Sequence, residues 1–210
     1  MTGPTAHAGR LRIVGLAVAV AVAVGLVGLG TGACTGDDGG GEGGPTPAPA
    51  GGAAVLPGPV PDDLALRPAP TDSPVAPKVT GTLTDGSPLA LADLWADRPV
   101  VLTFFSSWCN LCGDRQGGFS ELAARYRDRV VFVGVAGEDD EESVQAFLRQ
   151  HRVEYPVLVD TDGSIARSYA VREPPAVILV ARGGALLRGW PGGLDSNAVD
   201  DELRTLVLAP

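Results

Sequence analysis

The chain has 210 residues, 45% of them apolar, and a formal net charge of −9 at pH 7. This length allows one domain of ordinary size together with additional segments, and the apolar fraction is sufficient for a core. The acidic balance argues against nucleic acid and anionic lipid as partners, because both carry negative charge.

The first 33 residues have the pattern of an export signal. Arg10 and Arg12 precede an apolar stretch at residues 13–29, and small residues follow before Cys34. A basic region, an apolar region and a small-residue exit predict a secretory signal peptide. The apolar stretch is slightly shorter than the ~20 residues of a usual membrane span, but an uncleaved segment would still anchor the chain. In either case the residues after 34 are expected outside the cytoplasm.

Residues 34–78 are expected to form a disordered tether. Residues 37–44 are acidic and rich in glycine, and ten prolines follow between residues 45 and 77. Glycine-rich sequence is flexible and proline-rich sequence is extended, so neither favours a packed core. The folded domain is therefore expected to comprise residues 79–210.

Residues 79–210 show strand patterns that alternate with helix patterns. Runs of β-branched and aromatic residues predict strands, whereas apolar residues at helical spacing predict helices. We expect strands at 79–83, 100–105, 130–135, 155–159, 176–180 and 185–190, and helices at 89–95, 112–127, 141–151, 164–170 and 198–207. Asp139 or Asp140 is the expected cap of the third helix, and Ser196 that of the last. This order predicts an α/β domain with a central mixed β-sheet flanked by helices.

Two cysteines, Cys109 and Cys112, follow directly after the buried strand at residues 100–105. This spacing places the first sulfur at a helix N-terminus, where free N–H groups and the helix dipole favour thiolate over thiol. The two sulfurs lie one helical turn apart, close enough to form a small disulfide ring. The pair therefore predicts a site that makes and breaks disulfides.

Two other interpretations of the pair stay open. A structural disulfide is one, although so short a loop restricts the unfolded chain little. A zinc site is the other, but it needs four ligands, and only Cys34, His7 and His151 remain among the cysteines and histidines. We expect no metal and no cofactor beyond the redox-active Cys109–Cys112 disulfide.

The order of elements, the Trp-Cys-x-x-Cys at residues 108–112 and a proline before a later strand resemble thioredoxin. Residues 104–109 resemble the strand-to-motif signature of the exported TlpA/ResA-like branch, and residues 155–163 resemble its inserted segment. The Pro-Ala at residues 175–176 looks like the proline loop of actinobacterial DsbE-like proteins. The resemblance implies a thioredoxin-like fold with a TlpA-type N-terminal extension and insertion, and thiol–disulfide oxidoreductase activity.

The resemblance also implies roles for individual residues. Cys109 would be the nucleophile that forms a mixed disulfide, and Cys112 would resolve it. Pro175 would be a cis-proline that faces the disulfide, and Pro174 would lie against the substrate chain. Trp108 would shield the sulfurs and contact the substrate.

Resolution by Cys112 needs a proton acceptor. The buried acid that thioredoxins carry six residues before the first cysteine is replaced by Thr103. Glu138 follows the predicted strand at 130–135 and is the candidate acceptor; the alternative is that it belongs to a solvated acidic run. His151 lies near the end of a predicted helix and is expected to be structural.

Residues 31–34, Thr-Gly-Ala-Cys, resemble a bacterial lipoprotein signal, although the family prefers leucine where Thr31 stands. The resemblance implies a lipid on Cys34 and a domain anchored to the outer side of the cell membrane; the alternative is an ordinary thiol near a cleavage site. Implied partners are exported thiol or disulfide proteins, with apocytochrome c and cytochrome c maturation among the candidates. A CcdA- or DsbD-like membrane protein would supply electrons.

Two other functions stay open, and a third, that of a peroxiredoxin, is disfavoured. A DsbE-like oxidant would use the same cysteines to install disulfides. A peroxiredoxin would need cysteine three residues after Thr103, where Ser106 stands. A non-enzymatic copper-delivery or redox-sensing protein shares the fold, but the copper family needs Cys-x-x-x-Cys, and the spacing here is one residue shorter.

Overall fold

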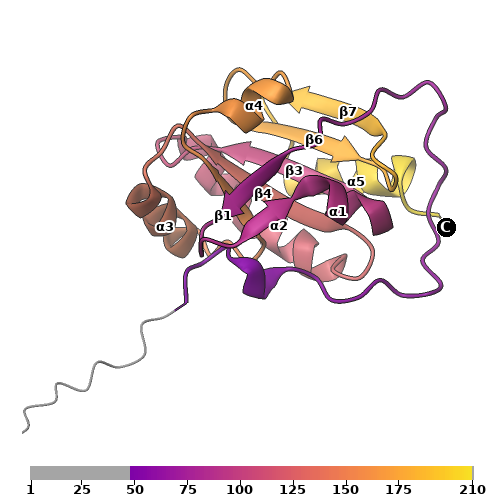
Figure 1. The fold of residues 1–210 in the computed structure, drawn as a ribbon, viewed down its shortest axis with the longest axis horizontal. Coiled ribbons are helices and arrows are strands. Elements are labelled where there is room, and N and C mark those ends of the chain that lie inside the picture. Colours follow the sequence, from indigo (N-terminus) through magenta and orange to yellow (C-terminus); the bar gives the residue numbers. More distant parts are fainter. Residues whose placement is uncertain (1–47, 210) are drawn as a thin grey trace, which may run out of the picture. The chain divides into compact units, whose positions relative to one another are not determined.

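The computed structural model describes residues 48–209, and all of them belong to one compact unit. The predicted signal peptide and Cys34 lie outside the described residues. Within 48–209, strands form a seven-stranded mixed sheet in the order β2-β1-β5-β4-β3-β6-β7, with helices on both faces (Figure 1). This confirms the predicted α/β class with a central mixed sheet flanked by helices.

The sheet is built around the strand that precedes the cysteines. The strands are β1 (Thr80–Leu83), β2 (Pro88–Ala90), β3 (Val100–Phe105), β4 (Val131–Gly137), β5 (Val157–Asp160), β6 (Ala176–Val180) and β7 (Leu186–Pro191). β3 pairs in parallel with β4 and antiparallel with β6. All six residues of β3 are buried, which accounts for its unbroken β-branched and aromatic sequence.

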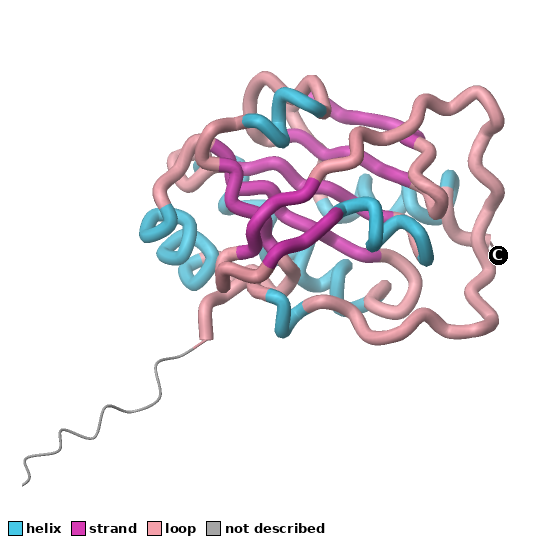
Figure 2. Tube along the Cα trace, viewed as in Figure 1, coloured by secondary structure: helices cyan, strands magenta, loops and turns pink. Residues whose placement is uncertain are grey.

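The sheet separates the core into two layers. Helices lie over both faces of the sheet (Figure 2). The helices are η1 (Ala53–Val55), α1 (Leu91–Asp97), α2 (Asn110–Arg125), α3 (Glu141–Gln150), α4 (Ser164–Ser168) and α5 (Ser196–Leu206). Apolar side chains of α2, α3 and α5 share one layer with Cys109 and Cys112, whereas α1 and α4 contribute to the other. Within residues 48–209, no helix has both the length and the apolar character needed to cross a bilayer.

Most helix ends lie one or two residues from the predicted ones, and the starts of α2 and α5 have a local cause. α2 begins at Asn110, two residues earlier than predicted, because Cys109 itself occupies the N-cap position. The last helix begins at Ser196, so the prediction that Ser196 caps it is wrong. Asp195 is the cap, and its carboxylate accepts a hydrogen bond of 2.9 Å from the N–H of Ala198. Asp140, one of the two predicted candidates, caps α3.

Residues 48–78, here called the strap, pack against the domain, so a disordered tether is the wrong description of this part of the chain. The carbonyl of Gly51 accepts a hydrogen bond of 2.7 Å from the N–H of Val157, which begins β5. Further along, Leu66 forms a β-bridge with Leu208, and Val75 forms one with Ala185. Figure 2 shows the strap as an irregular loop that follows the domain between these attachments.

The partners of the strap explain why its composition is misleading. Buried Arg98 donates from Nη2 to the carbonyl of Gly58 at 2.6 Å and from Nη1 to the carbonyl of Arg127 at 3.1 Å. The hydroxyl of Thr84 donates to the carbonyl of Ala50 at 2.5 Å. Side chains of the folded domain thus donate hydrogen bonds to carbonyl oxygens of the strap. The strap can therefore pack without the apolar periodicity of a helix or a strand.

Candidate active site

Cys109 and Cys112 form a disulfide at the N-terminus of α2, directly after β3. The S–S distance is 2.07 Å and the two Cα atoms are 5.2 Å apart. The N–H of Cys112 donates to Sγ of Cys109 at 3.2 Å. Free N–H groups and the helix dipole at this position favour a thiolate on Cys109 once the disulfide is reduced.

The two sulfurs differ in their access to solvent. Cys109 is 8% exposed and Cys112 is 1% exposed. Two large apolar side chains stand out beside them, with Trp108 61% and Leu111 48% exposed. A partner therefore reaches Cys109 before Cys112, and it meets an apolar rim around the disulfide. The sequence predicted this contact for Trp108 but not for Leu111.

The turn that leads into Cys109 is tied to the end of β4. The Ser106 hydroxyl donates to the carbonyl of Gly137 at 2.6 Å. The N–H and the hydroxyl of Ser107 donate to the two carboxylate oxygens of buried Asp139, at 2.6 and 2.7 Å. Asp139 therefore positions the active-site turn, a role that the sequence reasoning missed. Its position could have indicated this role, because Asp139 follows β4 by two residues and β4 runs parallel to β3. Parallel strands end at the same edge of a sheet.

Glu138, the candidate proton acceptor, lies at the same end of β4 but is exposed and has a positive φ of 58°. Its N–H donates to the carbonyl of Asp160 at 3.3 Å. Its Oε1 lies 3.8 Å from the point that a Cβ of Gly163 would occupy. The carboxylate is thus directed toward the turn after β5, and the proposed proton transfer remains a prediction.

Three neutral polar side chains form a hydrogen-bonded row in the layer of the core that also holds Cys112. Oγ1 of Thr103 lies 3.3 Å from the hydroxyl oxygen of Tyr155, which donates to Oε1 of Gln116. All three side chains are buried, and burial raises the pKa of the Tyr155 hydroxyl well above its ordinary value. Gln116 follows Cys112 by one helical turn on the inner face of α2. Thr103 occupies the position where thioredoxins have a buried acid, and its hydrogen-bonded neighbours Tyr155 and Gln116 were not identified from the sequence.

The peptide bond between Pro174 and Pro175 is cis, as predicted. β6 begins at the next residue, Ala176, which lies opposite Phe104 near the carboxyl end of β3. Because Cys109 follows the same end of β3, the proline loop and the disulfide share one edge of the sheet.

His151 packs against the active-site helix as well as its own. Its ring centroid lies 4.5 Å from that of Phe147. A Cβ at Gly113, the residue after Cys112, would lie 2.5 Å from Cε1 of His151. The absence of a side chain at position 113 therefore lets the imidazole pack on the first turns of α2.

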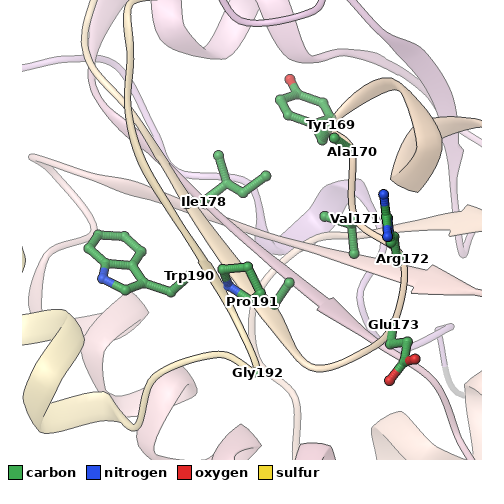
Figure 3. A pocket seen from close by; sticks show the side chains of 11 residues that line it. Tyr169, Ala170, Val171, Arg172, Glu173, Ile178, Trp190, Pro191 and Gly192 are labelled. Carbon is green, nitrogen blue, oxygen red and sulfur yellow. The ribbon is translucent and has the colours of Figure 1, made fainter.

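A cavity of about 420 Å³ lies beside the proline loop, between the segment before it and the ends of β6 and β7 (Figure 3). Tyr169, Val171, Ile178 and Trp190 contribute apolar surface to it, and the charged Arg172 lies at its edge (Figure 3). Ile178 belongs to the core layer opposite the one that holds the cysteines. The cavity suits an apolar side chain. In the part of the chain that the structure describes, no cluster of three or more metal-ligating side chains occurs.

The sheet order, the disulfide at the start of the helix after a central strand, and the cis-proline at the same edge define a thioredoxin-like thiol–disulfide oxidoreductase. The sequence profile of the AhpC/TSA family matches residues 74–188, which is more than half of the chain. The protein therefore belongs to the AhpC/TSA family.

Known relatives are similar in sequence and in fold. The chain is 24% identical over 133 residues to the thiol-disulfide oxidoreductase ResA of Bacillus thuringiensis, covering 63% of this chain and 76% of ResA. The solved structure of MTB dsbF is 27% identical with a TM-score of 0.59, over 64% of this chain and 98% of that one. The exposed lipoprotein thioredoxin Etrx1 of Streptococcus pneumoniae is 26% identical with a TM-score of 0.56, over 62% of this chain and all (100%) of that one.

Proposed function

We propose that the protein is exported, is tethered to the membrane through Cys34, and exchanges disulfides with exported polypeptides through Cys109 and Cys112. The observation that carries the proposal is the disulfide itself, more accessible at Cys109 and rimmed by exposed Trp108 and Leu111. An apolar rim of this kind suits a polypeptide partner. Support for export comes from the signal pattern at residues 1–33.

The exchange follows from the unequal access of the two sulfurs. The thiolate of Cys109 attacks one sulfur of the partner's disulfide, a mixed disulfide forms, and the partner's other sulfur leaves as a thiolate. Cys112 then loses its proton and attacks Sγ of Cys109, which releases the second partner thiol and restores the Cys109–Cys112 disulfide. Two electrons pass to the partner. Glu138 is the proposed acceptor of the Cys112 proton.

The proposed partners are exported proteins that carry thiols or disulfides, with apocytochrome c as the specific candidate. A CcdA- or DsbD-like membrane protein is the proposed source of electrons. Support for this assignment comes from the similarity to ResA-type oxidoreductases.

Running the same steps in reverse would make the protein an oxidant that installs disulfides. MTB dsbF, to which the chain is similar, was solved in mixed oxidized and reduced forms, and exchange in either direction uses both forms. The reduction potential of the cysteine pair decides between the two directions.

Fractionation of cells that express the full chain tests the membrane tether. We expect the wild-type protein in the membrane fraction. Cys34→Ser should either appear in the soluble exported fraction or stay in the membrane through an uncleaved signal. Mass spectrometry should find acyl chains on Cys34, and several are needed for stable anchoring, at ~0.8 kcal/mol per buried CH₂. An unmodified mature N-terminus would disprove lipid tethering.

A further inference from the structure

Arg115 connects the active-site helix to the turn that follows β7. It lies three residues after Cys112 on α2 and is half-buried. Its Nη1 donates a hydrogen bond of 2.9 Å to the carbonyl oxygen of Gly192. A guanidinium carries five N–H donors, so this contact leaves most of them free.

The same turn brings the guanidinium next to the proline loop. Gly193 has a φ of +66°, and a Cβ placed on it would lie 2.5 Å from Nη1 of Arg115 and 3.1 Å from Cβ of Pro175. Arg115 and Pro175 therefore flank the same glycine, and a side chain there would clash with the guanidinium and crowd Pro175. The bare glycine allows the guanidinium to lie beside the loop that shares its sheet edge with the disulfide.

The proline loop lacks the donors that a polypeptide partner needs. Neither Pro174 nor Pro175 has an N–H group, so at these two positions the loop can accept hydrogen bonds but cannot donate them. A chain that lies across the disulfide and against this loop presents carbonyl oxygens to it. Buried without a donor, each such oxygen costs binding free energy.

Among residues 48–209, Arg115 forms no ion pair, so its charge is available to a partner. Its one hydrogen-bond partner among residues 48–209 is a neutral carbonyl, and the ion pairs in this part of the chain involve other arginines. The adjacent Asp114 on α2 is exposed, as are Arg172 and Glu173 before the proline loop.

We infer that Arg115 binds an oxygen acceptor of the partner polypeptide, beside the cysteine that reacts with Cys109. The acceptor is a carbonyl or carboxylate oxygen, and Arg115 supplies the donor that Pro174 and Pro175 lack. This inference rests on the proposed exchange with polypeptides. Arg115 takes no part in the chemistry at sulfur, so its loss affects binding of the partner and leaves the reaction with small thiols intact.

Two disulfide-bonded peptides test the inference on the full chain. They are identical except that one has glutamate and the other alanine beside a cysteine, and dithiothreitol serves as the small reactant. We expect Arg115→Gln to lower kcat/KM for peptide reduction about tenfold, through KM, since a hydrogen bond to a charged group is worth ~1.5 kcal/mol or more. The rate of reduction of the Cys109–Cys112 disulfide by dithiothreitol and the pKa of Cys109 should not change.

The two peptides distinguish the source of the oxygen. Equal losses with both identify a backbone carbonyl, whereas a larger, salt-sensitive loss with the glutamate peptide, rescued by Arg115→Lys, identifies a carboxylate. Gly193→Ala should reproduce the selective loss with Arg115 still present, and Arg149→Gln on the exposed end of α3 is the matched control. An unchanged KM, or an equal fall in the dithiothreitol rate, would overturn the inference. A wild-type chain that reacts with dithiothreitol but with neither peptide would overturn the proposed function itself.

Discussion

The division of labour between the two cysteines rests on their position at the start of α2. Cys109 is the N-cap residue, and Sγ receives an N–H from the first helical turn. Cys112 lies one turn further on, inside the core. The helix terminus thus stabilises the sulfur that meets the partner, and burial protects the sulfur that resolves the mixed disulfide.

Single cysteine variants test this division. We expect Cys109→Ser to abolish reduction of insulin disulfides, and Cys112→Ser to accumulate mixed disulfides with partner proteins because nothing resolves them. Non-reducing electrophoresis detects these adducts. Faster labelling of Cys112 than of Cys109 by iodoacetamide at neutral pH, in the reduced wild-type protein, would reverse the assignment.

The neighbouring acids Asp139 and Glu138 allow a matched comparison. Asp139→Asn should lower the free energy of unfolding by ~1–2 kcal/mol, because it replaces a carboxylate that accepts two hydrogen bonds from Ser107 by a neutral amide. Glu138→Gln removes an exposed charge and should leave stability within ~0.5 kcal/mol. Denaturant unfolding measures both.

The same pair separates stability from proton transfer. If Glu138 accepts the Cys112 proton, Glu138→Gln slows release of the mixed disulfide and lowers the pKa of Cys109, since a nearby negative charge opposes thiolate formation. Stopped-flow kinetics and thiolate absorbance measure these two effects. No change in either would make Glu138 a surface charge.

At the scale of elements, the sequence predicted those parts of the fold that local patterns determine. β3 and β6 have the predicted bounds, because their apolar runs are rich in β-branched residues, follow a proline and are too short for a core helix. The short strand β2 was missed, since its three residues form a strand only by pairing with β1. Asp139, Arg115 and the Tyr155–Gln116 pair were missed for a similar reason. Their partners lie 32 to 77 residues away in the chain.

The attachment of the strap to the turn after β1 should depend on pH. Oδ2 of Asp85 accepts a hydrogen bond of 2.7 Å from the N–H of Ala53, and this bond, followed by that from Ser87, lowers the pKa of Asp85 below its ordinary 3.8. Because the pKa of Asp85 is lowered in the folded state, its carboxylate stabilises the attached strap above about pH 4. This stabilisation is lost as the pH falls through the folded-state pKa.

Amide exchange at Ala53 measures this dependence. In the wild type, protection of the Ala53 N–H should fall below about pH 4 relative to amides in β3. In Asp85→Asn it should be weaker at neutral pH and should show no corresponding loss on acidification. Equal pH profiles for the two proteins would show that Asp85 does not hold the strap.

At the scale of the whole molecule, the strap extends the folded unit to residues 48–209, whereas the sequence predicted a domain that begins at residue 79. The tether is correspondingly shorter than predicted. Only residues 35–47 separate Cys34 from the described chain. Even fully extended, that many residues span ~45 Å. Under the proposed lipid anchor, the redox domain therefore works close to the membrane surface.

Arg98 is the residue through which the strap and the domain support each other. Arg98→Met should lower the free energy of unfolding by ~2–3 kcal/mol, because the carbonyls of Gly58 and Arg127 both lose a charged donor. Limited proteolysis should then cleave the strap first. Arg149→Met, at an exposed position on α3, is the control. The same melting temperature for Arg98→Met and wild type would contradict this account of the strap.

The reduction potential of the Cys109–Cys112 pair tests the central claim, that this disulfide is the working redox centre. Titration of the full chain in glutathione or dithiothreitol buffers, read by alkylation of free thiols, should show one reversible two-electron couple. We predict that a reductant shows a potential near −270 mV or lower and that an oxidant shows one near −120 mV. A disulfide that these buffers cannot reduce, or that shows no reversible couple, would contradict the claim.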